Sequence, residues 1–146
     1  MEMALKTGVG AQSGARSAST QGPTPLLRQT DLPGETIAQK FWNAVQMRGA
    51  TVALRQKEFG IWMEVTWTEF GEQVRAIAMG LVAHGFQPGD TASILANTCR
   101  EWSYADYGTL CAGGVSSGIY PTDAADQVEY LSLDSGSSFI FVEDDE

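Results

Sequence analysis

Cysteine and histidine are scarce in this sequence. The 146 residues include two cysteines, Cys99 and Cys111, and one histidine, His84. A structural zinc site takes four ligands, and a disulfide framework needs several cysteine pairs at regular spacings. The composition therefore predicts neither a zinc site nor a disulfide scaffold, and we expect reduced thiols.

Basic residues are also few, and they are unevenly placed. The formal net charge is −9, and no Lys or Arg follows Arg100. The segment from Pro121 onward carries eight acidic residues. Phosphate contacts depend on Lys and Arg, so this charge distribution predicts no nucleic-acid partner.

Long hydrophobic runs are absent from the sequence. No apolar stretch approaches the roughly 20 residues that a transmembrane helix needs. The first ten residues contain one Lys and no apolar core of the kind that a secretory signal has. We therefore expect no transmembrane segment and a cytoplasmic location.

The sequence divides into two regions by composition. Residues 1–33 are rich in Gly, Ser, Ala, Thr, Gln and Pro and show neither a helical nor a strand period. Such composition predicts a disordered tail. Residues 34–146 hold the periodic segments and are expected to form an incomplete α/β domain.

The segment from Thr91 to Pro121 is typical of a βαβ unit. An apolar run over residues 91–96 precedes a helical stretch over about 100–112, and an extended run over 115–120 follows. Strand, helix and strand within about thirty residues predict two parallel strands joined by a crossover. A further helix over about 124–133, capped by Thr122-Asp123, and a strand over 139–142 extend the order to βαβαβ.

Three elements are expected before this unit. Thr36 is placed to cap a helix over 37–48, in which Ile37, Phe41, Ala44 and Val45 share a face. Two short runs around Glu58-Phe59-Gly60 predict a hairpin.

The third of these elements is a long helix. Thr66 and Glu69 form a capping box at its start, and an apolar stripe ending at Leu81 follows. Gly85 stops it, and Phe86 is expected to fold back on the last turn. The fold class is therefore α/β: a partial parallel sheet preceded by a helix, a hairpin and a long helix.

Residue chemistry alone indicates no active site. Residues 114–118 match the G-x-S-x-G nucleophile elbow, but the elbow lies between a strand and a following helix, and here the order is reversed. Trp62 with Trp67 could make an aromatic platform, although ordinary packing is the better interpretation. We therefore assign no catalytic, cofactor-binding or metal-binding residue.

An ordered set of short motifs resembles the AMP-forming acyl-CoA synthetases, over roughly residues 33–145. The first motifs are Thr66-Trp67-Thr68-Glu69-Phe70, Gly80-Leu81 and Pro88-Gly89-Asp90; the later ones are Ser93-Ile94-Leu95, Glu101-Trp102, Ala105-Asp106, Ala112-Gly113, Ile119-Tyr120-Pro121-Thr122, Gln127-Val128 and Asp134-Ser135-Gly136. The Tyr-Pro-Thr with Gln-Val is most similar to the long-chain fatty acid–CoA ligase branch.

The resemblance implies a two-step ligase. ATP and a carboxylate give an acyl-adenylate and pyrophosphate, coenzyme A then takes the acyl group, and Mg²⁺ neutralises the phosphates. In that family the catalytic and nucleotide-binding parts follow the region matched here. The chain is therefore expected to be an inactive N-terminal fragment that binds no cofactor.

The resemblance also implies partners and a location. Fatty acid, ATP and coenzyme A would be substrates of the full-length enzyme, which would be cytoplasmic or peripheral to a membrane, and some relatives form homodimers. Two other hypotheses stay open: a free-standing α/β interaction domain derived from such an enzyme, and a fragment of an aryl-acid ligase or a peptide-synthetase adenylation domain.

Overall fold

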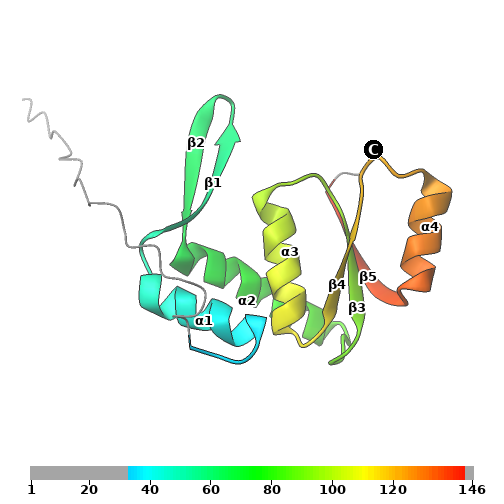
Figure 1. The fold of residues 1–146 in the computed structure, drawn as a ribbon, viewed down its shortest axis with the longest axis horizontal. Coiled ribbons are helices and arrows are strands. Elements are labelled where there is room, and N and C mark those ends of the chain that lie inside the picture. The colour runs from blue at the N-terminus through cyan, green and yellow to red at the C-terminus, as the bar shows by residue number, and fades with distance from the viewer. Residues whose placement is uncertain (1–32, 144–146) are drawn as a thin grey trace, which may run out of the picture.

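The computed structural model describes residues 33–143 (Figure 1). The expected disordered tail over 1–33 lies outside the described residues apart from Pro33, and so do the last three acidic residues. Within the described range no helix is both long enough and apolar enough to cross a membrane.

Helix α1 (Ile37–Arg48) begins and ends where the sequence predicts. The Thr36 hydroxyl accepts a hydrogen bond from the Gln39 amide at 3.1 Å, and the Gln39 side chain accepts one from the Thr36 amide at 3.3 Å. Phe41 and Ala44 are buried, but Ile37 is exposed, contrary to prediction. Ile37 occupies the first helical position, outside the stretch that packs on the rest of the chain.

Helix α2 (Trp67–Ala83) has the predicted signals at both ends. The Thr66–Glu69 capping box is present. At the other end the Phe86 amide donates to the Leu81 carbonyl at 3.0 Å, and Gly85 adopts φ 96°. This is the Schellman arrangement, and it carries Phe86 into the core.

Strands β1 (Val52–Glu58) and β2 (Ile61–Thr66) form an antiparallel hairpin that is a separate two-stranded sheet (Figure 1). The turn is Phe59-Gly60, and Glu58, which was also expected in the turn, is the last residue of β1. Trp67 packs with Phe41 and Phe70, whereas Trp62 stays exposed, so the two tryptophans make no common platform. The expected packing of Trp62 is wrong, because nothing in the described chain covers that part of β2.

The α/β prediction is confirmed by a three-stranded parallel sheet. Strand β3 (Thr91–Leu95) lies between β4 (Val115–Ile119) and β5 (Ser137–Val142), in the order β4-β3-β5. Helix α3 (Arg100–Cys111) connects β3 to β4, and α4 (Ala125–Asp134) connects β4 to β5.

Helix α4 differs from its prediction. Its N-cap is Ala124, not Thr122 or Asp123, and the side chain of Gln127 accepts a hydrogen bond from the Ala124 amide at 3.2 Å. No α4 residue is buried, and within the helix only Val128 and Ser132 are half-buried. The helix packs mainly on β5 at the margin of the sheet, which leaves most of its surface open.

Two apolar clusters form the core, and α2 contributes to both. The first contains Phe70 and Val74 of α2 with Phe41 and Tyr104. The second contains Leu81 with Phe86 and Ala92 and reaches the aromatic rings of β5. Helix α2 therefore joins the α1–hairpin side of the molecule to the parallel sheet.

Replacing Leu81 by Ala should destabilise the chain by about 2–4 kcal/mol, because the side chain is 4% exposed and its removal leaves a cavity. Met79→Ala, on the exposed side of the same helix, should cost less than about 0.5 kcal/mol. Urea titrations of both variants measure the difference. If Leu81→Ala and the parent chain unfolded at the same urea concentration, the apolar face of α2 would be exposed to solvent and not buried.

Candidate functional site

The order of the parallel strands reverses at β3. The chain leaves β3 for one neighbour, β4, and then crosses to the other neighbour, β5. The two crossover helices, α3 and α4, lie on opposite sides of the sheet (Figure 1). In open α/β sheets ligands bind beyond the carboxyl ends of the strands at such a reversal, so a ligand site is expected between the ends of β3 and β5.

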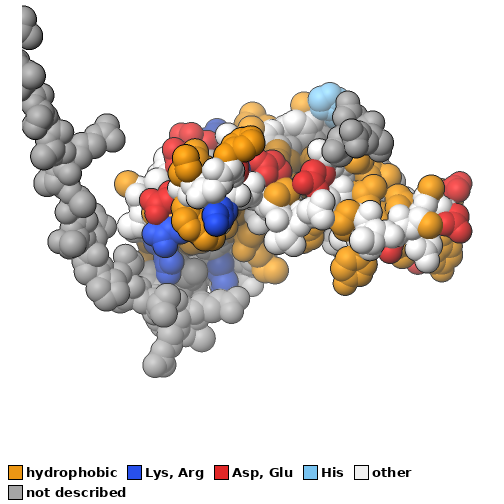
Figure 2. All heavy atoms as spheres, turned by 90° about the horizontal axis from the view of Figure 1, so that it is seen from above, with side chains coloured by type: hydrophobic (Ala, Val, Ile, Leu, Met, Phe, Trp, Pro, Cys, Tyr) orange, Lys and Arg blue, Asp and Glu red, His pale blue; other side chains and the backbone are white. Residues whose placement is uncertain are grey.

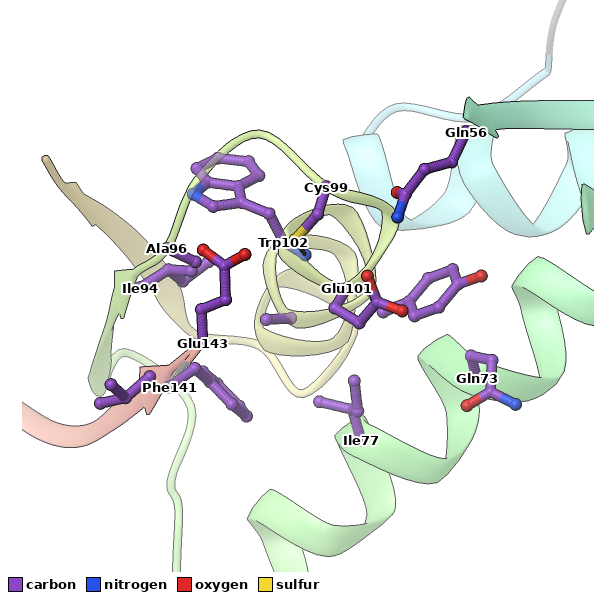
Figure 3. A pocket seen from close by; sticks show the side chains of 13 residues that line it. Gln56, Gln73, Ile77, Ile94, Ala96, Cys99, Glu101, Trp102, Phe141 and Glu143 are labelled. Atoms are coloured by element: carbon purple, nitrogen blue, oxygen red, sulfur yellow. Dashed lines mark hydrogen bonds between the residues drawn. The ribbon is translucent and has the colours of Figure 1, made fainter. Parts of the chain in front are cut away.

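A cavity of about 470 Å³ lies at this place. Its apolar part is made by Ile77, Ile94 and Phe141, with Trp102 on another side (Figure 3). Its polar part includes Glu101 and Glu143, together with Gln56, Gln73 and Cys99. The size suits a small ligand.

The N-terminus of α3 opens beside the cavity, and two of its amide donors are already used. The Arg100 amide donates to the side-chain oxygen of Gln56 at 2.7 Å. The Trp102 amide donates to the Cys99 sulfur at 3.4 Å. A helix N-terminus attracts anions through such unpaired amides, so these contacts weaken its ability to hold a phosphate.

The two carboxylates of the cavity are held by hydrogen bonds. One oxygen of Glu143 accepts from the Asn97 amide at 2.6 Å and from its side chain at 2.9 Å. Glu101 accepts from the Arg100 side chain at 2.7 Å. Burial, the largest single influence, favours the neutral form of Glu101. The hydrogen bond and charge of Arg100, the Glu101 backbone amide and the Cys99 side chain together outweigh it, so the pKa of Glu101 lies below its ordinary value. At neutral pH this carboxyl is therefore charged.

Cys99 is the nucleophilic side chain nearest these groups. Burial raises the pKa of its thiol; the Trp102 amide opposes this, and the negative charges of Glu101 and Glu143 add to it. Burial raises the pKa of Cys111 as well. Because the thiolate is the reactive form, neither cysteine is activated for covalent catalysis.

The described residues do not fit a nucleotide triphosphate with its metal. No Lys or Arg is among the residues that line the cavity, and the neighbouring Arg100 is bound by Glu58 at 2.9 Å and Glu101 at 2.7 Å. No group of three His, Cys, Asp or Glu side chains in residues 33–143 is arranged to hold a metal ion. The polar part of the cavity is anionic, and phosphates would be repelled there.

The other motifs of the sequence lie apart from the cavity. Residues 115–118 of the G-x-S-x-G match are within β4, and the Ser116 hydroxyl donates to Asp106. The His84 ring contacts the Gly80 carbonyl at 2.8 Å, at the end of α2. His84 and Ser116 therefore have different hydrogen-bond partners, one at the end of α2 and the other in β4 and α3.

Sequence reasoning missed the contacts that bring the hairpin to α3. Gln56 and Glu58 both bind Arg100, which follows Gln56 by 44 residues. No local pattern connects these positions. Only the alternation of β1, which puts Gln56 and Glu58 on one side of the strand, could have grouped them.

Comparison with known proteins places this geometry in a family. The family model described as AMP-binding enzyme matches residues 41–146. The chain belongs to the AMP-binding enzyme family. The matched segment contains both core clusters and the whole parallel sheet, and it omits only the first residues of α1 from the described elements.

Relatives and solved structures agree with this assignment. Over 86 residues the chain is 40% identical to the long-chain-fatty-acid–CoA ligase FadD15 of Mycobacterium bovis, covering 59% of this chain and 14% of that protein. Over 118 residues it is 37% identical to the Drosophila melanogaster long-chain-fatty-acid–CoA ligase heimdall, covering 78% of this chain and 17% of that protein. The N-terminal subdomain of Klebsiella oxytoca NpsA has the same fold, with a TM-score of 0.67 at 18% identity, over 75% of this chain and 28% of that one.

The Cys99 thiol should be alkylated by iodoacetamide severalfold more slowly than a cysteine in an unstructured peptide at pH 8, because its raised pKa lowers the thiolate fraction. The measurement uses Cys111→Ala, in which Cys99 is the remaining thiol. Glu143→Gln in that background should increase the rate. A rate equal to that of the peptide would contradict the burial of this thiol.

Proposed function

We propose that the chain is the N-terminal scaffold of an ATP-dependent, AMP-forming long-chain fatty acid–CoA ligase. Such an enzyme joins ATP and a fatty acid into an acyl-adenylate and pyrophosphate, and transfers the acyl group to coenzyme A. The family assignment and the two ligases with 40% and 37% identity support this proposal. The chain spans about one sixth of the length of these relatives, between 14% and 17%.

The negative charge of the cavity supports the proposal that this chain is a scaffold. Adenylation develops negative charge on phosphates, and preorganised cations or amide donors must stabilise it. At the strand ends this chain presents Glu101 and Glu143, and its Arg100 is held by two carboxylates. In this proposal residues 33–143 position elements of the ligase, and the reacting groups come from the rest of the enzyme.

The proposal extends to the substrates and the setting of the whole enzyme. Fatty acid, ATP with Mg²⁺, and coenzyme A would bind to the complete ligase, which would act in the cytoplasm or at a membrane surface. The proposal also includes a homodimer of the complete ligase.

Two other functions compete with it. A free-standing α/β interaction domain would keep this fold without a ligase reaction. A different adenylate-forming enzyme, acting on an aryl or amino acid, would share the fold as NpsA does, but the identity there is 18% against 40% for a named long-chain ligase.

Pyrophosphate exchange tests the proposal in two steps. The 146-residue chain should show no exchange that depends on both ATP and palmitate, because the cavity found in residues 33–143 has no Lys or Arg in its lining to hold a phosphate. A chimera that carries residues 41–146 in place of the matching segment of the Mycobacterium bovis ligase should form palmitoyl-CoA within about tenfold of the parent rate.

Two results would count against the proposal. Exchange by the isolated chain would show a catalytic site within it. A folded chimera that fails with palmitate, or that activates only aryl or amino acids, would assign the scaffold to another function. The intact Mycobacterium bovis ligase is the positive control in both steps.

A further inference from the structure

The β1–β2 hairpin is attached to the rest of the chain by two different kinds of contact. Near its base, apolar side chains pack against the first core cluster: Ala53, Leu54 and Val65. There the Trp67 amide also donates to the Thr51 carbonyl at 3.0 Å. Farther out, the hydrogen bonds and ion pairs that join the hairpin to α3 within residues 33–143 all involve Arg100. The base is therefore held by apolar burial, and the outer part, residues 56–63, is held by charge.

Arg100 joins three side chains into one network. Its guanidinium group binds Glu58 of β1 at 2.9 Å and Glu101 of α3 at 2.7 Å. Its backbone amide donates to the Gln56 side chain at 2.7 Å, and Gln56 in turn donates to Glu58 at 3.3 Å. Seen from above, acidic and basic side chains lie close together over this side of the molecule (Figure 2). One cation thus lies between a carboxylate of the hairpin and a carboxylate of the helix.

The two carboxylates would repel each other without this cation. Both bind the same guanidinium group, so Glu58 and Glu101 lie close enough for their charges to interact. The side chains of Arg100 and Glu58 are 28% and 30% exposed, so dissolved salt can screen the pair. The ionic strength therefore sets how firmly the outer hairpin is held to α3.

We propose that Arg100 is an electrostatic latch that holds residues 56–63 against the start of α3. Gln56 and Glu101 line the cavity, one from the hairpin and the other from the helix (Figure 3). When the latch opens, Gln56 leaves the cavity wall and releases the Arg100 amide, which widens the cavity on that side. The contacts of the latch all lie within residues 56–101, so this inference is independent of the ligase proposal.

Hydrogen exchange of the Arg100 amide measures the opening of the latch, because the Gln56 side chain is its acceptor. In NMR exchange experiments, raising NaCl from roughly 0.05 M to 1 M should speed this exchange about two- to fivefold relative to an unstructured peptide. The Trp102 amide, which donates to Cys99 within the start of α3, should not respond. An equal response of both amides would mean that the helix start frays. That result, or an unchanged Arg100 rate, would overturn the proposal.

Matched variants separate the latch from a general change in charge. Glu58→Gln should speed exchange of the Arg100 amide about two- to fivefold at low salt and remove its dependence on salt. Arg100→Gln leaves Glu58 and Glu101 facing each other, so exchange at position 100 should be fastest at low salt and should slow as salt screens the repulsion. Glu64→Gln breaks the Arg55–Glu64 pair inside the hairpin and should leave this exchange unchanged.

Alkylation of Cys99 tests whether opening reaches the cavity, which Cys99 and Gln56 both line. In the Cys111→Ala background, Glu58→Gln should raise the iodoacetamide rate about two- to fivefold, and Glu64→Gln should not. Both variants remove one negative charge and one ion pair, so a general loss of stability would act on both alike. An unchanged rate in Glu58→Gln, an equal rise in Glu64→Gln, or faster exchange with salt in Arg100→Gln would contradict the latch.

Discussion

The close approach of α2 and α3 at Ile77 and Gly108 is the contact on which the rest of the structure depends. A Cβ atom at position 108 would lie 2.4 Å from the Ile77 Cγ2 atom, so only glycine allows this helix separation. It lets one helix, α2, pack into both apolar clusters. The hairpin and the parallel sheet, which share no strand, are thereby fixed in one body.

The position of α3 then determines the character of the candidate site. With α3 fixed, Arg100 meets the carboxylates of Glu58 and Glu101, and Gln56 occupies an amide at the helix start. The donors and the cation that could receive a phosphate are thus used for structure. A cavity lies where the strand order reverses. Its negative charge suits a scaffold better than a nucleotide-binding site.

Local chemistry made most of the elements predictable. The Thr36 and Thr66 caps, the Gly85-Phe86 stop and the Phe59-Gly60 turn all lie where the sequence indicates. Prediction failed where an outcome depended on distant partners: α4 lacks its expected cap and burial, and the Gln56–Arg100 contact joins segments with no shared pattern. The acidic cavity could not be predicted, because the strand order that forms it has no local signal.

Two glycine substitutions test the central claim most directly. Gly108→Ala should destabilise the chain by about 1–3 kcal/mol in urea titration, because the added methyl group collides with Ile77. Gly80→Ala, in α2 with no atom within 4 Å of the added Cβ, should be neutral or stabilising by up to about 1 kcal/mol. If Gly108→Ala were as stable as Gly80→Ala, the α2–α3 contact would not hold the two halves together.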